Sequence, residues 1–257
     1  MFRFGENWAS FSRRLDEERI NRAMKSLQSL FGEDALKGKS FLDIGCGSGL
    51  FSIAAARLGA NKILGLDVDP VSVSTSQENA AHWVEEGASA LLFRQLSVLD
   101  STAMDALGKY DVVYSWGVLH HTGNMSLALK NAAQPVADRG LLMIAIYNRH
   151  WSSLPWKFVK WLYNRVGPFG QKTIIGVFTP VIFAAKWLVT FKNPLNMKRG
   201  MDFMHNIKDW VGGYPYEYAS IPEMTDTLKK LGFEMVLVNP ATVPTGCNEF
   251  VSRKESR

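Results

Sequence analysis

The hydrophobic positions between residues 40 and 147 form short apolar runs separated by segments with helical spacing. The predicted strands are residues 40–44, 62–67, 90–96, 111–115 and 140–147, and the predicted helices are residues 50–58, 71–85 and 125–136. Strands that alternate with helices are typical of a doubly wound parallel sheet, so an α/β fold is predicted. Ligands of such sheets bind at the carboxyl ends of the strands.

The pattern changes on both sides of this region. Residues 12–31 carry apolar positions at helical spacing, which predicts a helix before the first strand. After residue 147 the alternation stops, and helical stretches are expected at 152–165 and 172–191, in what we interpret as an insertion. The alternation resumes with a predicted helix at 221–231, which Gly232 should end, and with strands at 233–238 and 247–252.

Three glycines directly follow the first predicted strand, in Phe41-Leu-Asp-Ile-Gly-Cys-Gly-Ser-Gly49. Without a Cβ atom, Gly45, Gly47 and Gly49 permit a tight turn and a close approach of the backbone to a ligand. The following helix presents its first amides at the same place. Asp67 ends the second strand, where a carboxylate can accept the hydroxyls of a ribose. These features predict a site for an adenosine moiety, and the spacing G-x-G-x-G disfavours a dinucleotide, which needs G-x-G-x-x-G.

Two further segments stand in order with the glycine loop: Ile63-Leu-Gly-Leu-Asp-Val-Asp-Pro70 and Tyr110-Asp-Val-Val-Tyr-Ser-Trp-Gly-Val-Leu-His-His121. With these three segments the chain resembles the class I S-adenosylmethionine-dependent methyltransferases. The resemblance implies a mostly parallel, seven-stranded Rossmann-like sheet with an antiparallel last strand and a helical lid insertion. It also implies S-adenosyl-L-methionine as the cofactor. The pair Asn148-Arg149 and the stretch from Trp210 to Phe233 are similar to the O-methyltransferases of ubiquinone biosynthesis.

The resemblance also implies the cofactor contacts. Asp43 and the glycine loop would hold the methionine part, Asp67 the ribose, and Val68 would flank the adenine. Many relatives place an acid after the third strand to bind the adenine amino group, but Ser97 stands there, and Asp100 is the other candidate. The predicted cofactor-binding residues are Asp43, Gly45, Cys46, Gly47, Gly49, Asp67, Val68, Ser97, Val98, Ser115 and Trp116.

Three residues near the expected methyl group are candidates for catalysis: His120 and His121 after the fourth strand, and Tyr147 at the end of the fifth. Methyl transfer needs positioning, exclusion of water and deprotonation of a hydroxyl or thiol acceptor. An imidazole titrates near neutrality, so either histidine is a candidate general base, and packing is the alternative role. Adjacent histidines are expected on different faces of a helix, and no acidic ligands stand beside them, so no metal site is predicted.

The net charge of +5 is concentrated in one segment. Residues 149–208 contain ten basic residues and one acidic residue, Asp202, which gives a net charge of +9. One interpretation is a lid or dimer helix that buries its apolar face against the core. The other is a basic aromatic surface that rests peripherally on an anionic membrane. A transmembrane helix is not expected, because Pro180 and Lys186 interrupt the apolar stretch at 173–191.

The predicted organisation has four parts: an N-terminal helical segment at 1–38, an S-adenosylmethionine-binding core at 39–148, a basic aromatic helical lid at 149–215, and a C-terminal helix with the last two strands at 216–257. Two cysteines without disulfide spacing and the absence of a secretory signal favour the cytoplasm. The chain could be a monomer or a homodimer.

The predicted function is methyl transfer to a small-molecule or lipophilic acceptor, through oxygen or sulfur. Trp210, Tyr214 and Tyr216 could form a wall of the acceptor pocket, which suits phenols, quinone precursors and thiols alike. A nucleic-acid (tRNA) methyltransferase is the alternative, because the segment at 149–208 is basic and aromatic. A nucleic acid is the less favoured partner, because the motif used for base amines and an RNA-binding module are both absent.

Overall fold

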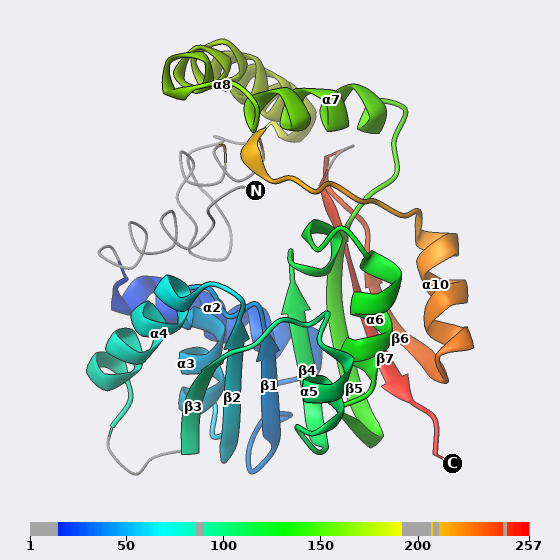
Figure 1. The fold of residues 1–257 in the computed structure, drawn as a ribbon. Coiled ribbons are helices and arrows are strands. Elements are labelled where there is room, and N and C mark those ends of the chain that lie inside the picture. Colours follow the sequence, from blue (N-terminus) through cyan, green and yellow to red (C-terminus); the bar gives the residue numbers. More distant parts are fainter. Residues whose placement is uncertain (1–14, 86–89, 192–206, 208–210, 244–245, 257) are drawn as a thin grey trace.

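Seven strands form one sheet at the centre of the molecule (Figure 1). The computed structural model describes residues 15–256 except 86–89, 192–206, 208–210 and 244–245. The strands are β1 (Ser40–Ile44), β2 (Lys62–Asp67), β3 (Ala90–Gln95), β4 (Tyr110–Trp116), β5 (Val136–Tyr147), β6 (Phe233–Asn239) and β7 (Cys247–Lys254). Their order is β3-β2-β1-β4-β5-β7-β6, and β7 runs antiparallel to both of its neighbours. The predicted mostly parallel, seven-stranded sheet is confirmed.

The strand order reverses direction between β1 and β4. Leu42 of β1 pairs with Leu64 of β2 on one side and with Val113 of β4 on the other, both in parallel register. The connections on the two sides of β1 therefore leave the sheet in opposite directions. A crevice at the carboxyl ends of the strands is expected at such a point, and the glycine loop follows β1 there.

Helices cover both faces of the sheet (Figure 1). They are α2 (Glu17–Phe31), α3 (Leu50–Arg57), α4 (Pro70–Trp83), α5 (Ser101–Asp105), α6 (Met125–Ala133) and α10 (Ile221–Lys230). Alternate residues of one strand enter opposite apolar clusters, as the strand period requires. Phe41 of β1 packs with α2 and α3, whereas Leu42 packs with α5, α6 and α10.

The element boundaries agree with the prediction within a few residues, with two instructive differences. β5 begins at Val136 rather than 140, because Val136 pairs with Tyr110 before a register shift in the ladder. The apolar pattern does not show this, because the polar pair Asp138-Arg139 interrupts it. The helix predicted at 172–191 is α8 (Pro168–Thr190), and it begins earlier because Pro168 fits the first helical turn.

The helices α7 (Ser153–Tyr163) and α8 lie beyond the carboxyl ends of the parallel strands (Figure 1). They pack around a small cluster that contains Tyr163, Ile207 and Val211. Many apolar side chains of both helices are exposed. One row of α8 is thus packed in this cluster while other apolar side chains of the two helices are exposed, so the two interpretations of the inserted helices stay predictions. None of the helices in the described part of the chain is long and apolar enough to cross a membrane.

Candidate functional site

The glycine loop has the backbone that its sequence predicts. Gly45, Gly47 and Gly49 have φ angles of 77°, 58° and 77°, in the region that side chains disfavour. A Cβ atom on Gly45 would lie only 2.3 Å from Cγ2 of Val118. Residue 45 must therefore be glycine for the segment after β4 to pack on the loop. This contact brings the candidate catalytic segment beside the candidate cofactor loop.

Asp67 faces the glycine loop from the end of β2. Its Oδ2 accepts a hydrogen bond from the Gly47 amide at 3.0 Å, and its Oδ1 accepts one from the Asp69 amide at 2.9 Å. A carboxylate has about four acceptor positions, so positions remain for the hydroxyls of a ribose. Burial raises the pKa of Asp67, and the two amides oppose that shift. Val68 follows Asp67 in the chain, and its side chain is largely exposed.

Asp43 and Cys46 are buried below the loop. The hydroxyl of Ser52 in α3 donates to Oδ2 of Asp43 at 2.7 Å, so Asp43 links β1 to the helix behind the loop. Burial raises the pKa of Asp43 to about 7 and raises the pKa of Cys46 well above its usual value. The Sγ atom of Cys46 lies 3.6 Å from the hydroxyl of Ser76.

Polar side chains of α4 hold the outer part of the loop, and the sequence reasoning missed them. Ser76 donates to the carbonyl of Gly47 at 3.0 Å, and Asn79 donates to the carbonyl of Ser48 at 2.8 Å. Their signal in the sequence is a row of small polar residues at helical spacing on the inward face of α4: Ser72, Thr75, Ser76 and Asn79.

The residues after β3 lie beside Asp67, because the Leu96 amide donates to the Asp67 carbonyl at 2.9 Å. The hydroxyl of Ser97 accepts from the Leu99 amide, and the carbonyl of Val98 accepts from the side chain of Asn131. Asp100 caps α5 by accepting from the amide of residue 103. Ser97 and Asp100 thus each accept one backbone amide, and the choice between them for an adenine contact stays a prediction.

Ser115 and Trp116 end β4 and have different surroundings. The buried hydroxyl of Ser115 donates to the carbonyl of Ile44 at 3.1 Å, which joins β4 to the residue before the glycine loop. The indole Nε1 of Trp116 donates to Glu249 of β7 at 2.9 Å. This bond joins the end of β4 to β7, and a cofactor contact of Trp116 stays a prediction.

The two histidines lie together, which corrects the expectation that they point to different faces of a helix. Residues Leu119–His121 form a single 3-10 turn, η1, and the rings of His120 and His121 have centroids 4.5 Å apart. The Nδ1 atom of His121 lies 2.7 Å from the carbonyl oxygen of Pro215. Among the described residues, neither ring nitrogen of the fully buried His120 has a hydrogen-bond partner.

Both histidines are neutral at physiological pH. Burial, together with the nearby charges of His121 and Lys160, lowers the pKa of His120 well below its usual value. The Ala145 backbone opposes this shift weakly but does not meet hydrogen-bond geometry with the ring. Burial, and then Lys160, lower the pKa of His121 to about 3.

Tyr147 lies between the histidines and the ring of Tyr216. Its ring lies 4.2 Å from that of His120 and 5.0 Å from that of Tyr216. The Nζ atom of Lys160 in α7 lies 5.3 Å from the Tyr147 ring and 4.8 Å from the Tyr216 ring. Lys160 is only 1% exposed, and the sequence reasoning missed it. Its signal is a lysine at a buried position of an amphipathic helix, in one row with Ser153 and Tyr163.

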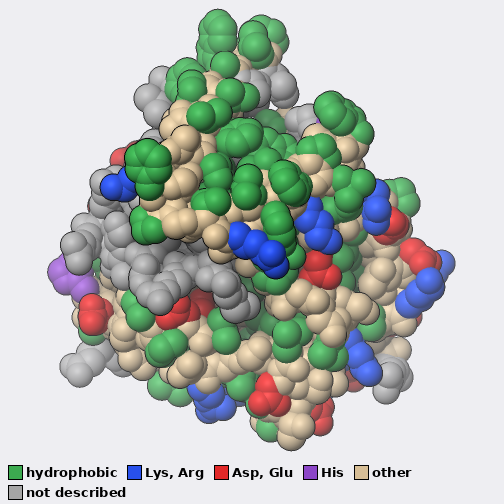
Figure 2. Space-filling view, turned by 45° about the horizontal axis from the view of Figure 1, so that its top comes forward, with side chains coloured by type: hydrophobic (Ala, Val, Ile, Leu, Met, Phe, Trp, Pro, Cys, Tyr) green, Lys and Arg blue, Asp and Glu red, His purple; other side chains and the backbone are tan. Residues whose placement is uncertain are grey.

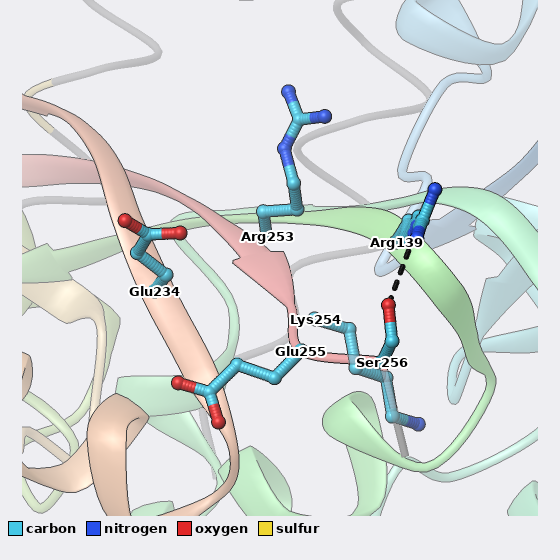
Figure 3. Close-up of a pocket in the computed structure, with 6 residues that line it drawn as sticks. All are labelled: Arg139, Glu234, Arg253, Lys254, Glu255 and Ser256. Atoms are coloured by element: carbon cyan, nitrogen blue, oxygen red, sulfur yellow. Dashed lines mark hydrogen bonds between the residues drawn. The ribbon is translucent and has the colours of Figure 1, made fainter.

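An open surface depression of about 400 Å³ lies away from the glycine loop and the histidines (Figure 3). Its walls include Arg139 near the start of β5, Glu234 at the start of β6 and Arg253 near the end of β7. This is the end of the sheet opposite to the glycine loop. In Figure 3, Arg139 and Ser256 share a hydrogen bond, and Arg253 points away from the other labelled side chains. We assign no function to this depression.

Within the described residues, no group of three metal-ligating side chains gathers.

Sheet order, glycine loop and Asp67 together define a class I, Rossmann-like methyltransferase. Residues 15–238 match the family model described as a methyltransferase domain, so the chain belongs to that family. This confirms the predicted class of protein, whose cofactor is the predicted S-adenosyl-L-methionine.

Curated relatives match parts of the chain. The ubiquinone biosynthesis O-methyltransferase of Azorhizobium caulinodans is 34% identical over 124 residues, which are 46% of this chain and 46% of the relative. The ribosomal protein L11 methyltransferase of Photobacterium profundum is 50% identical over 54 residues, 21% of this chain and 18% of the relative. The chain thus spans less than half the length of these relatives.

Among solved structures, the magnesium protoporphyrin IX methyltransferase of Synechocystis PCC 6803 with bound SAH is similar in fold. Its TM-score is 0.57 at 18% sequence identity, and the match covers 92% of this chain and 83% of that one. At this identity the likeness concerns the fold alone.

Proposed function

We propose that the chain transfers a methyl group from S-adenosyl-L-methionine to an oxygen of a small, lipophilic acceptor that binds at the carboxyl ends of β4 and β5. The observation that carries this proposal is the buried cluster of His120, His121, Tyr147 and Tyr216. It contacts the glycine loop through Val118 and Gly45. A cofactor held by the loop would then face this cluster.

The cofactor supplies an electrophilic methyl group on a sulfonium. The chain has to orient the acceptor, exclude water and take up the acceptor proton. A neutral imidazole has one donor and one acceptor nitrogen. The nitrogens of His120 are buried and unpaired within the described chain, which costs about 1–3 kcal/mol for such a group, and an acceptor hydroxyl would satisfy one of them. The Pro215 carbonyl holds the ring of His121, so its Nε2 faces the site as the candidate base, and its pKa of about 3 keeps the imidazole unprotonated but makes it a weaker base than an ordinary histidine.

The surroundings favour an aromatic or otherwise lipophilic acceptor. The rings of Tyr147 and Tyr216 offer apolar faces with hydroxyl groups at their edges. Burial raises the pKa of Tyr216 to about 12, so this phenol stays protonated and can donate a hydrogen bond. The similarity to ubiquinone biosynthesis O-methyltransferases supports a phenolic oxygen as the acceptor atom. A thiol is the alternative acceptor. Placement in the cytoplasm, the domain boundaries and the oligomeric state stay predictions.

The test is the release of S-adenosylhomocysteine from S-adenosylmethionine with a panel of catechols, prenylated phenols and thiols. Turnover with phenolic substrates, lost in His121→Gln, is the expected result. Turnover with thiols alone would overturn O-methylation. An absence of S-adenosylhomocysteine binding in calorimetry would remove the proposal as a whole.

The alternative substrate, tRNA, rests on the charge of residues 149–208. The exposed side chains of α7 and α8 are largely aliphatic or aromatic, and aliphatic side chains do not stack on bases. We therefore rank tRNA second. Methyl incorporation into bulk tRNA from labelled S-adenosylmethionine would reverse that ranking.

A further inference from the structure

The outer surface of α7 and α8 is unusually apolar for a surface in contact with water. Its large exposed side chains include Trp151, Leu154, Phe158, Phe169, Trp187 and Phe191. Phe169, Phe191 and Trp151 are 86%, 84% and 82% exposed. Figure 2 shows hydrophobic side chains gathered over these helices, with basic side chains near them. Extended exposed apolar patches of this kind mark interaction sites.

The periodicity of α8 sets it apart from an ordinary surface helix. One row, with Ile174, Ile175, Phe178 and Ile182, packs in the small cluster with α7. Apolar residues such as Val177, Val181 and Leu188 occupy other sides of the helix and are exposed. A helix that is apolar all round is normally buried in protein or lipid. Within the described residues its outer sides stay uncovered, as expected of a surface that receives a partner.

The charge of the same segment indicates which partner. Lys157, Arg165 and Lys172 are exposed on or between the two helices, and neither helix contains an acidic residue. The whole segment 149–208 carries a net charge of +9. A second copy would bring the exposed bases Lys157, Arg165 and Lys172 of two such faces together, which like-charge repulsion opposes. An anionic surface is complementary to these charges.

We propose that the outer surface of α7 and α8 docks the protein on an anionic lipid bilayer. Trp and Phe side chains would enter the boundary between headgroups and acyl chains, and Lys and Arg would contact anionic headgroups. The helices would lie on the membrane, in keeping with the finding that no described helix can span one. This placement is independent of the proposed methylation. If the membrane docking and the proposed methylation both hold, the carboxyl ends of β4 and β5 face the bilayer. The bilayer would then supply a lipophilic acceptor.

The test is co-sedimentation with vesicles of phosphatidylcholine alone and of phosphatidylcholine mixed with phosphatidylglycerol. The wild type is expected to sediment with the anionic vesicles, and less so at high salt, because salt screens the attraction. The triple variant Trp151→Ser, Phe158→Ser and Phe169→Ser should lose this binding. Its matched control is Leu92→Ser with Val236→Ser, which removes exposed apolar side chains at the two edges of the sheet.

A charge test complements the apolar one. Lys157→Glu with Lys172→Glu should weaken anionic vesicle binding about tenfold or more, whereas Lys25→Glu with Lys130→Glu, exposed lysines elsewhere, should not. Calorimetry with S-adenosylhomocysteine checks that each variant is folded. It also tests the proposed methylation separately, because cofactor binding does not depend on vesicle binding.

Two results would overturn docking on lipid. One is no sedimentation at low salt, or sedimentation that the triple variant leaves unchanged. The other is a dimer in light scattering that the triple variant converts to a monomer, without vesicle binding, since the face would then belong to a second copy.

Discussion

The Nδ1 atom of His121 lies 2.7 Å from the backbone carbonyl oxygen of Pro215, 94 positions later in the chain. A carbonyl oxygen only accepts, so in the neutral ring Nδ1 carries the proton and Nε2 presents the lone pair. The Pro215 carbonyl thereby fixes the tautomer and the orientation of an imidazole beside the glycine loop. A general base needs such an arrangement.

Replacement of this imidazole should impair catalysis without loss of the cofactor. His121→Gln keeps a donor that can reach the Pro215 carbonyl but removes the basic nitrogen. We expect kcat to fall about 100-fold or more, with S-adenosylhomocysteine affinity unchanged in calorimetry. His82→Gln, at an exposed position of α4, is the matched control. An unchanged kcat would exclude His121 as the base.

The pKa of His121 also predicts a pH dependence of stability. Its pKa is about 3 in the folded protein and about 6.5 in the unfolded chain, so below pH 6.5 the folded state binds fewer protons. Stability from this group therefore falls as the pH falls, from about 6.5 toward about 3. His121→Leu should reduce the slope of the unfolding free energy by about 1.4 kcal/mol per pH unit across that range.

Urea titrations at several pH values measure this slope. Asp43 contributes with the opposite sign, because its pKa is raised to about 7 and protonation stabilises the folded state. The two proteins must therefore be compared at each pH, since the wild type alone shows the sum of all groups with shifted pKa values, His120 and Asp67 among them. Equal slopes for wild type and His121→Leu would show that His121 is not buried as a neutral ring.

Local patterns were sufficient for most of the fold. The strands and helices follow from the periodicity of apolar residues and from the glycines and prolines that end them. The positive φ angle of Gly232 at the end of α10 is expected because the residue is a glycine. The glycine loop and Asp67 were found because their spacing is set by one turn and one strand. These elements depend on contacts that are close in the sequence.

The missed features depend on contacts that are distant in the sequence. The bond from Trp116 to Glu249 joins residues 133 positions apart, and the contact that holds the ring of His121 comes from Pro215, 94 positions later. In the sequence, Lys160 is one of ten basic residues between positions 149 and 208. Only the packing of α7 shows that its side chain is buried. The sequence left both burial of the apolar stretch at 173–191 and an exposed membrane surface open, because a pattern of apolar residues does not show what covers them.

Asp67 should be necessary for cofactor binding. Its carboxylate holds the Gly47 amide and keeps acceptor positions at the expected ribose, so Asp67→Ala removes both. We expect S-adenosylhomocysteine affinity to fall about tenfold or more, since hydrogen bonds to charged groups are worth about 1.5–3 kcal/mol. Asp138→Ala, exposed at the opposite end of the sheet, is the control. Equal affinities would place the ribose elsewhere.

The contact between Gly45 and Val118 should show coupling in a double-mutant cycle. Gly45→Ala forces a side chain into a backbone with φ of 77° and against Val118 Cγ2. We expect a loss of about 1–3 kcal/mol in unfolding free energy. Val118→Ala removes the overlapping methyl groups but not the backbone strain, so the double variant should recover part of the loss. Additive effects of the two substitutions would contradict direct contact.

Lys160 should control the acidity of both histidines. Its charge is one cause of the low pKa of His120 and His121, but burial is the larger cause for each. Lys160→Met keeps a long side chain under the rings of Tyr147 and Tyr216 and removes the charge. The pKa of both imidazoles should rise and yet stay below the usual 6.5, because both rings remain buried.

A pH titration of the imidazole proton signals by nuclear magnetic resonance measures the two values. Lys157→Met, exposed on the same helix, should leave them unchanged. If Lys160→Met leaves them unchanged as well, the lysine acts through packing rather than through its charge.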